Sequence, residues 1–274
     1  MLSSLTERDS LPITKGYVLS KFRDILEGIG KLPGGKYHIK LKPDAQPVQH
    51  PPRAVPEKKK AAYKDELERL CSSGIIEPVQ GHTACINSVV PVSKPDGSIR
   101  LCLDPKDLNK SIKRNQYYSK TFDEVSAELH GGKYFTLVDC ASGYWMVELG
   151  NESSLLTTFN TPWEKYKWLR LPFGFKVSAD VFQERLNAVL KEVKGITGCI
   201  NNILTRGVDS KDHDVDLLQL LETARMNGIK FNPKQLQFKT TKCDFFGQTI
   251  KPEGMKVDHK KVEPINQMKE PKDK

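Results

Sequence analysis

The chain has 274 residues, of which 38% are hydrophobic and 28% are charged, and its formal net charge is +9. This composition is typical of a soluble globular protein with a buried core, and no apolar run approaches the roughly 18 residues that span a bilayer. The start of the chain, MLSSLTERDSLP, lacks the apolar segment of a secretory signal peptide, so we expect an intracellular, soluble protein with no membrane partner.

The six cysteines are far apart and form no Cys-x-x-Cys pair. This spacing argues against a zinc module and, in an intracellular protein, against a disulfide framework, so free buried thiols are expected. The excess of Lys and Arg is typical of proteins that contact phosphate, although many basic proteins bind no nucleic acid.

The N-terminal part predicts three segments. Residues 1–35 are expected to be a leader or linker with one short helix, which stops at Pro33. Residues 36–56 contain five prolines, which favours an extended strap over the surface. A helix follows between Pro56 and Gly74, with its apolar face at Tyr63, Leu67, Leu70 and Cys71. Its opposite, lysine-rich face is either solvated or phosphate-facing, and the sequence leaves both open.

The rest of the chain alternates strands and helices. Residues 87–93 and 99–104 predict a hairpin around the turn sequence KPDG. Strands are then expected on either side of Gly143 within 133–150, with Asp139 ending the first, and as a pair at 155–160 and 165–172. The remaining expected elements are a helix from Ser178, as N-cap, to Gly195; a hairpin at 196–205; a helix at 212–228; and strands at 234–240 and 243–250. This order predicts an α+β fold with antiparallel pairing.

The predicted hairpin at 196–205 carries two adjacent asparagines, Asn201 and Asn202. Asparagine is depleted in strands, and a buried amide needs hydrogen-bond partners. A tight type I′ turn, which favours Asn, would explain the pair without any chemical role.

Several blocks, in order, resemble reverse transcriptases, above all the pol polyprotein of gypsy-like long-terminal-repeat retrotransposons. These blocks are KPDGSIRLCLDPKDLNK, FTLVDCASGYWMVEL, LLTTFNTPWEKYKWLRLPFGF, SADVFQERLNAVL, GIKFNPKQLQF and CDFFGQTIKPEGMKVDHKKVE. The resemblance runs from about Lys36 to the last residue. It implies a right-hand polymerase with fingers and palm over 57–250 and a truncated connection toward a missing thumb over 251–274. The ribonuclease H domain, the integrase and the protease of the polyprotein are also expected to be missing.

The resemblance implies template-directed nucleotidyl transfer with a template–primer and a deoxynucleotide as partners and Mg²⁺ as cofactor. Family members hold two Mg²⁺ ions with one aspartate at the end of a palm strand and two in an aromatic-x-Asp-Asp hairpin. Asp139 matches the first, whereas the hairpin reads Cys199-Ile200-Asn201-Asn202. A neutral amide oxygen cannot offset the repulsion between two dications as a carboxylate does. We therefore predict weak or lost metal binding and loss of most polymerase activity.

Other residues carry roles only by the resemblance. Lys94 and Arg100 match the residues that grip the triphosphate, although they would also suit a solvated hairpin edge. Tyr144 matches the aromatic under the deoxyribose, although a core tyrosine would look the same. The remaining matches are Phe173 and Gly174 in the loop against nucleotide and template, Gln183 near the nucleic acid, Phe246 and Gly247 at the primer end, and Asp104 and Asn109 as framework positions. The sequence Ser178-Ala179-Asp180 departs from the family pattern at the helix start.

Three functions are compatible with these residues: an RNA-directed DNA polymerase, a non-catalytic module that binds nucleic acid or protein, and a degenerate fragment. The cytoplasm is the expected location of a retrotransposon polymerase, and the nucleus is the alternative for a host-adapted remnant. The sequence does not determine the oligomeric state.

Overall fold

The computed structural model describes residues 12–94, 97–245, 248–252 and 254–257, together with residues 263, 267 and 268. Its helices are α1 (Lys15–Lys21), α2 (Arg23–Leu26), α3 (Glu57–Ser72), α4 (Lys106–Ser111), α5 (Phe122–Glu128), α6 (Asn151–Leu156), α7 (Ser178–Leu190) and α8 (Ser210–Met226), with 3-10 turns η1 (Gly143–Met146) and η2 (Pro233–Gln235).

The strands are β1 (Ile76–Pro78), β2 (Ser88–Ser93), β3 (Ile99–Asp104), β4 (Tyr134–Asp139), β5 (Phe159–Asn160), β6 (Lys165–Trp168), β7 (Ile196–Cys199), β8 (Asn202–Gly207), β9 (Gln237–Thr240), β10 (Cys243–Phe245), β11 (Gln248–Lys251) and β12 (Gly254–Val257). The strand pairs in their sheets are antiparallel, so the predicted α+β class is confirmed.

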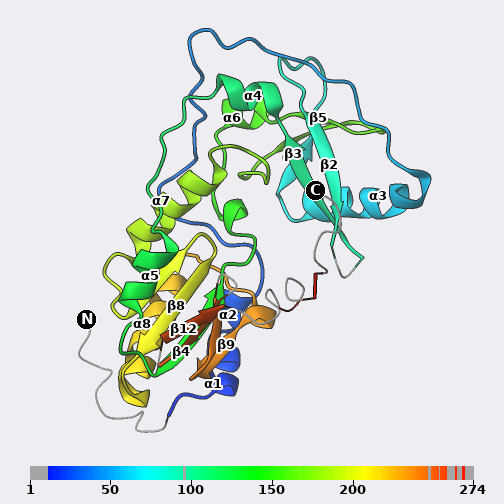
Figure 1. Ribbon diagram of the computed structural model, residues 1–274. Coiled ribbons are helices and arrows are strands. Elements are labelled where there is room, and N and C mark those ends of the chain that lie inside the picture. The colour runs from blue at the N-terminus through cyan, green and yellow to red at the C-terminus, as the bar shows by residue number, and fades with distance from the viewer. Residues whose placement is uncertain are drawn as a thin grey trace.

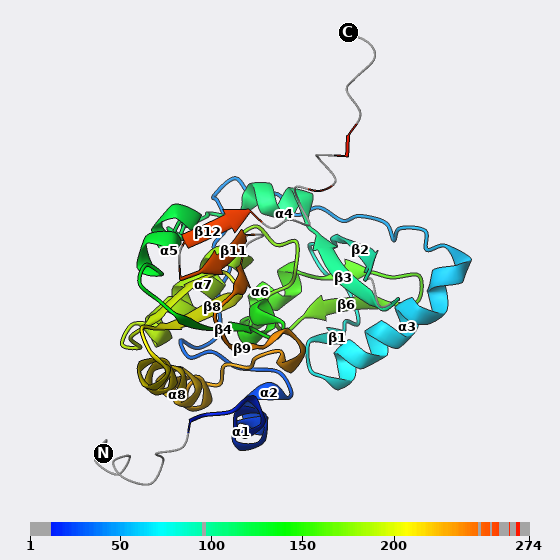
Figure 2. The same cartoon turned by 60° about the horizontal axis from the view of Figure 1, so that its bottom comes forward.

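The molecule has two parts (Figures 1 and 2). One part is built on the four-stranded sheet β7-β8-β4-β9, with α7 and α8 beside it. The other part holds the β2–β3 hairpin, the sheet β1-β6-β5 and α3. A third small sheet, β10-β11-β12, follows the first part in sequence.

The centre of the larger sheet is the pair β4–β8. Phe135, Thr136, Leu137 and Val138 are buried in succession, as expected of a strand covered on both faces. The antiparallel register runs from Tyr134 opposite Gly207 to Asp139 opposite Asn202. The last acid of β4 therefore lies directly across from the second asparagine of the hairpin.

Several predicted elements are confirmed. The β2–β3 hairpin pairs in register from Ser88–Asp104 to Ser93–Ile99. In α3, Tyr63, Leu67 and Leu70 are buried, as the apolar spacing indicates. The second helix of the sheet part, α8, begins at Asp209, whose side chain accepts hydrogen bonds from the backbone N–H groups of Lys211 and Asp212.

The second strand expected after Gly143 is wrong. Ser142 has φ +50° and is followed by the 3-10 turn η1, and residues 147–150 make only isolated bridges. Gly143 packs so closely here that a Cβ on it would stand 2.5 Å from Asn201 Oδ1 and 2.7 Å from Phe182 Cζ, so the turn has room for glycine at this position. No local β-propensity reports such a contact.

The expected strand 155–160 is wrong in its first half, because residues 151–156 form α6. The Thr157 hydroxyl accepts a hydrogen bond from the Trp168 N–H at 3.1 Å. This side-chain bond stands where a paired strand would make a backbone hydrogen bond. The segment 243–250 is a β10–β11 hairpin rather than one strand. The expected N-cap role of Ser178 is also wrong, because its hydroxyl donates to the Pro172 carbonyl and Val177 is the N-cap.

The N-terminal segments pack onto the rest of the molecule. Val18, Phe22 and Ile25 of α1–α2 are part of the main hydrophobic core. The strap 36–56 is extended and is bonded along its length to the rest of the molecule, for example where Tyr37 N–H donates to Glu148 O and His50 N–H donates to Ile86 O. Among the described helices, none is long and apolar enough to cross a membrane.

Candidate active site

Asp139 is the last residue of β4, an interior strand of the larger sheet. The backbone around it is fixed, because its carbonyl accepts from Asn232 N–H and the next N–H, of Cys140, donates to Asn201 O at 2.7 Å. Burial raises the pKa of the Asp139 carboxyl to about 6. The cause of this rise is desolvation, which disfavours the charged form of the carboxyl.

Asn201 lies within a strained turn, and Asn202 follows it. Cys199 and Asn202 are paired, so Ile200 and Asn201 form a two-residue hairpin loop. Ile200 has φ +55°, which is unusual for a β-branched residue, while Asn201 does not have a positive φ. A positive φ at the first central position alone belongs to a type II′ turn, not to the type I′ turn that the asparagines suggested.

The two amides occupy different surroundings. The Asn201 Oδ1 atom is buried and has no hydrogen-bond partner among the residues that the structure describes. It lies against Gly143, because a Cβ built on that glycine would stand 2.5 Å from Oδ1 and 2.7 Å from Phe182 Cζ. Asn202 lies across the strand pair from Asp139. The acid is therefore flanked by neutral amides, and one of these packs against the protein interior.

This donor set does not fit a pair of magnesium ions. Magnesium prefers carboxylate oxygens, and Asp139 is the one carboxylate among the three positions where the family is expected to hold metal. Within the described ranges, no group of three or more His, Cys, Asp and Glu side chains is placed to hold a metal ion.

Beside these residues lies an aromatic cluster that joins the two parts of the molecule. The ring centroid of Tyr144 is 5.1 Å from that of Phe173 and 5.8 Å from that of Phe182. The Arg100 guanidinium lies 4.9 Å from the Phe173 centroid. Three residues predicted from separate sequence blocks, Arg100, Tyr144 and Phe173, are thus brought together. Lys94 is half-buried at the end of β2, where its N–H donates to Ser98 O.

The loop at Phe173 and Gly174 packs closely against β3. Gly174 has φ +87°, and a Cβ there would stand 1.9 Å from the Leu103 carbonyl oxygen. Leu103 N–H in turn donates to Phe173 O at 2.9 Å. Asn109, expected as a framework residue, donates to Gly174 O and accepts from Lys176 N–H.

Gln183 lies in the interior on α7 rather than at the surface. Its Oε1 accepts from the Ile200 N–H of the turn, and its Nε2 donates to Asn187 Oδ1 at 2.7 Å. Asn187 was missed by sequence reasoning, although its i, i+4 spacing from Gln183 within an apolar helix face was a usable signal. Phe246 and Gly247 lie outside the described residues, so their predicted role at the primer end stays a prediction.

The arrangement of these elements is the fingers–palm fold of the right-hand type, with fingers in the part with β2–β3 and α3 and palm in the part with β4, β7, β8 and β9. Residues 92–250 match the family model of reverse transcriptase (RNA-dependent DNA polymerase). The chain therefore belongs to the reverse transcriptase family, and the relatives below place it with the corresponding region of long-terminal-repeat retrotransposons.

The similar curated proteins are longer than this chain. The Transposon Tf2-7 polyprotein of Schizosaccharomyces pombe is 25% identical over 100% of this chain and 21% of its own length. The uncharacterized protein K02A2.6 of Caenorhabditis elegans is 28% identical over 90% of this chain and 20% of its own length. The chain thus spans about a fifth of the curated relatives that it matches.

Solved structures share the fold. The foamy viral protease-reverse transcriptase in complex with RNA/DNA hybrid has a TM-score of 0.83 at 20% identity, covering 93% of this chain and 34% of that one. The same enzyme in complex with dsDNA also has a TM-score of 0.83 at 20% identity, with 93% and 54% covered. At this identity the likeness establishes the fingers–palm fold.

Proposed function

We propose that this chain is a reverse transcriptase fingers–palm module whose polymerase centre is silent and which keeps the capacity to bind a template–primer duplex. The observation that carries the proposal is the setting of Asp139. It lies opposite a neutral amide at Asn202, and the other amide, Asn201, packs against Gly143.

Charge repulsion is the physical reason to expect an inactive centre. Two magnesium ions about 4 Å apart repel strongly, and carboxylates normally offset this repulsion. Asp139 is the one carboxylate left among the three expected metal positions to offset it. Loss of one preorganised electrostatic group commonly costs about 10²–10³ in rate, and this chain lacks two.

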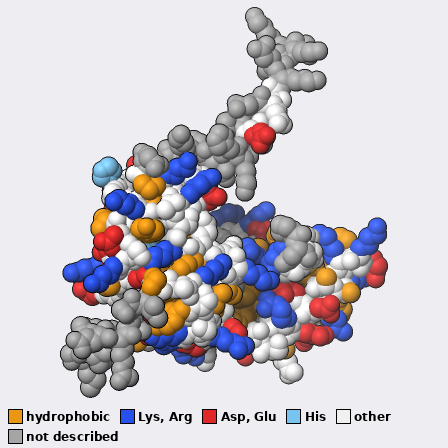
Figure 3. All heavy atoms as spheres, turned by 90° about the horizontal axis from the view of Figure 1, so that it is seen from below, with side chains coloured by type: hydrophobic (Ala, Val, Ile, Leu, Met, Phe, Trp, Pro, Cys, Tyr) orange, Lys and Arg blue, Asp and Glu red, His pale blue; other side chains and the backbone are white. Residues whose placement is uncertain are grey.

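The argument for retained duplex binding rests on residues outside the metal positions. The chain carries a net charge of +9, and blue Lys and Arg side chains occur on both parts of the face in Figure 3, several of them near the hollow between the parts. Lys94 and Arg100 are proposed to contact phosphate, and Tyr144 and Phe173 to contact a sugar or base. The solved relatives are complexes with dsDNA and RNA/DNA hybrid, which supports the same ligand class.

Primer extension on an RNA template, with Mg²⁺ and separately with Mn²⁺, tests the silent centre. The unmodified chain should extend no better than Asp139→Ala, and Asn201→Asp/Asn202→Asp should extend measurably. Extension by the unmodified chain above the Asp139→Ala level would contradict the proposal. A double variant that is folded, binds duplex and still fails would show that the asparagines are not the decisive change.

A salt titration tests duplex binding. Phosphate contacts release counterions, so the logarithm of the affinity should fall steeply and linearly with the logarithm of salt concentration. Arg100→Gln should weaken binding and reduce the slope by roughly one contact. Affinity that does not change with salt would count against phosphate contacts and favour a protein partner.

A further inference from the structure

The turn that carries the asparagines is held in an unfavourable backbone conformation. Ile200 has φ +55°, and such a conformation persists in a β-branched residue only when the surroundings impose it. Ile200 is also partly exposed, at 36%, so burial of its own side chain supplies little of the constraint. Another contact must fix the turn.

Gln183 makes that contact from α7. Its Oε1 accepts a hydrogen bond from the Ile200 N–H, which is the amide at the strained position. Because a backbone N–H can only donate, this bond fixes which end of the Gln183 amide is the oxygen. The Nε2 end must then point away from the turn, and it donates to Asn187 Oδ1 at 2.7 Å.

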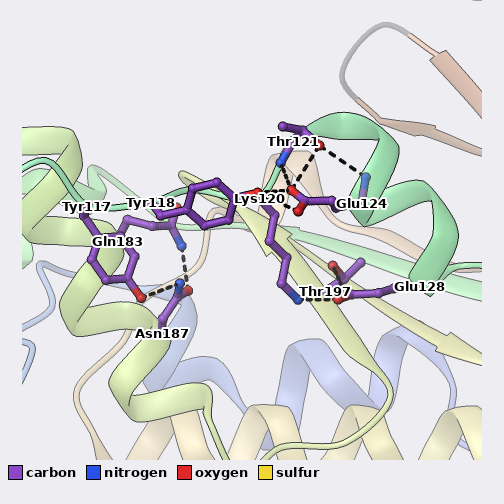
Figure 4. Close-up of polar contacts among 9 residues, drawn as sticks. All are labelled: Tyr117, Tyr118, Lys120, Thr121, Glu124, Glu128, Gln183, Asn187 and Thr197. Carbon is purple, nitrogen blue, oxygen red and sulfur yellow. Dashed lines mark hydrogen bonds and ion pairs between the residues drawn. The ribbon is translucent and has the colours of Figure 1, made fainter.

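The hydrogen-bond chain continues to a fixed point. Asn187 Nδ2 donates to the Tyr117 hydroxyl at 3.1 Å, as Figure 4 shows. The Tyr117 backbone N–H donates to Asp180, which is itself buried and paired with Arg114 at 2.6 Å. Each residue in this hydrogen-bonded series, from Gln183 to Asp180, is therefore bonded to a neighbour on both sides.

The strand side of the same hairpin has a separate support. In β7, the Thr197 hydroxyl donates to Glu128, and Glu128 is paired with Lys120 (Figure 4). The turn and the strand are thus held by different side chains, so that the contribution of Gln183 can be separated from general hairpin stability.

We propose that Gln183 is a positioning residue that imposes the backbone conformation of the Ile200–Asn201 turn, rather than a contact to the nucleic acid. Both ends of its amide are already used by Ile200 and Asn187, and its side chain is buried. A base or sugar could reach it only after the turn is released. The inference does not depend on polymerase activity or on duplex binding.

Amide hydrogen exchange at Ile200, measured by NMR, tests this directly. Gln183→Met keeps the side-chain length and removes the acceptor, so exchange at Ile200 should rise about tenfold, as expected for the loss of one hydrogen bond. Amides in the middle of β4 should keep their protection. The matched control is Gln219→Met on α8, which removes a side-chain bond to the Glu192 carbonyl and should leave Ile200 unchanged.

Gln183→Glu supplies a readout that a purely structural role would not give. A glutamate keeps an oxygen that can accept from the Ile200 N–H in either ionisation state, whereas methionine keeps none. Protection of Ile200, corrected for intrinsic exchange, should therefore survive in Gln183→Glu at neutral pH while it is lost in Gln183→Met.

Two results would overturn the proposal. One is unchanged exchange at Ile200 in folded Gln183→Met. The other is a loss of duplex affinity in that variant while the turn keeps its protection, which would restore the nucleic-acid role. If Gln183→Met does not fold, Asn187→Leu releases the far end of the amide and should still raise exchange at Ile200, and no rise there would equally reject the proposal.

Discussion

At the scale of single residues, the candidate active site holds one acid, Asp139, beside the neutral amides of Asn201 and Asn202. Asp139 keeps its place at the end of β4, but the groups around it do not compensate its charge, and its pKa is raised to about 6. The sequence indicated which three residues to expect at this site: Asp139, Asn201 and Asn202. It did not predict that Asn201 would pack against Gly143, because that contact joins chain segments far apart in sequence.

The raised pKa makes Asp139 a pH-dependent cost to folding. Between about pH 4 and 6 the folded state holds a proton that the unfolded chain releases, so stability falls as pH rises through this window. Asp139→Asn removes the cost. We expect it to raise the free energy of unfolding by roughly 1 kcal/mol at pH 7.5, reduced by solvent screening, and by nothing near pH 3.5. Urea unfolding at the two pH values measures this.

Asp209→Ala is a control whose effect on the free energy of unfolding should have the opposite sign. The pKa of Asp209 is lowered by the backbone N–H groups of Asp212 and Lys211 that it caps. Its stabilising contribution is present above the ordinary pKa of an aspartate and is lost as pH falls. This variant should be less stable than the unmodified chain at pH 7.5, with a smaller difference at pH 3.5. Equal pH profiles for the two variants would contradict the assignment of Asp139.

The strain at Ile200 gives a second prediction at this scale. Glycine adopts a positive φ without the steric cost that a β-branched residue incurs. Ile200→Gly should therefore raise the free energy of unfolding by a few tenths to about 1 kcal/mol. Ile203→Gly, at a buried strand position without a positive φ, should lower it clearly. Thermal unfolding of the two variants distinguishes local strain from general sensitivity of the hairpin.

At the scale of elements, the fingers and palm meet where the loop 171–174 packs on β3. The sequence predicted the β2–β3 hairpin from its turn and the palm hairpin from its flanking strands. It misassigned residues 143–150 and 151–156. There, Gly143 packs against Asn201 and Phe182, and the Thr157 hydroxyl accepts from the Trp168 N–H, contacts that the local sequence pattern does not indicate.

Gly174→Ala should disrupt this junction. A methyl group at Gly174 would overlap the Leu103 carbonyl, and φ +87° is unfavourable for alanine in addition. We expect a loss of at least about 2 kcal/mol in the free energy of unfolding. Gly97→Ala, at a positive φ but with open space around its Cβ, is the control and should cost less. Chemical denaturation of both variants gives the comparison.

At the scale of the whole molecule, α1 and α2 form part of the palm. Phe22 is fully buried, and the Arg225 guanidinium of α8 lies 4.4 Å from its ring centroid and pairs with Asp24 at 2.7 Å. The sequence marked residues 1–35 as a leader, because the helical pattern there is short. Its apolar residues gain a partner only when α8 is folded beside them.

Removal of residues 1–26 should therefore destabilise the palm. The truncation exposes the face of α8 that packs against α2, and Phe22→Ala alone should cost about 3–5 kcal/mol as a core truncation. Circular dichroism melting of the truncated chain, Phe22→Ala and the unmodified chain measures this. Melting temperatures that agree within error would show that α1 and α2 are dispensable to the fold.

The sequence by itself determined the family, the α+β class, most helices and hairpins, and the replacement of two expected acids by asparagines. These follow from local periodicity, turn chemistry and residue identity, each of which depends on only a few neighbouring residues. Only the tertiary structure decided that Arg100, Phe173 and Tyr144 stack in one cluster, that Gln183 holds the turn, and that the N-terminal helices belong to the core. These depend on contacts between segments separated by tens to hundreds of residues, whose geometry exists only once the sheets and helices are packed.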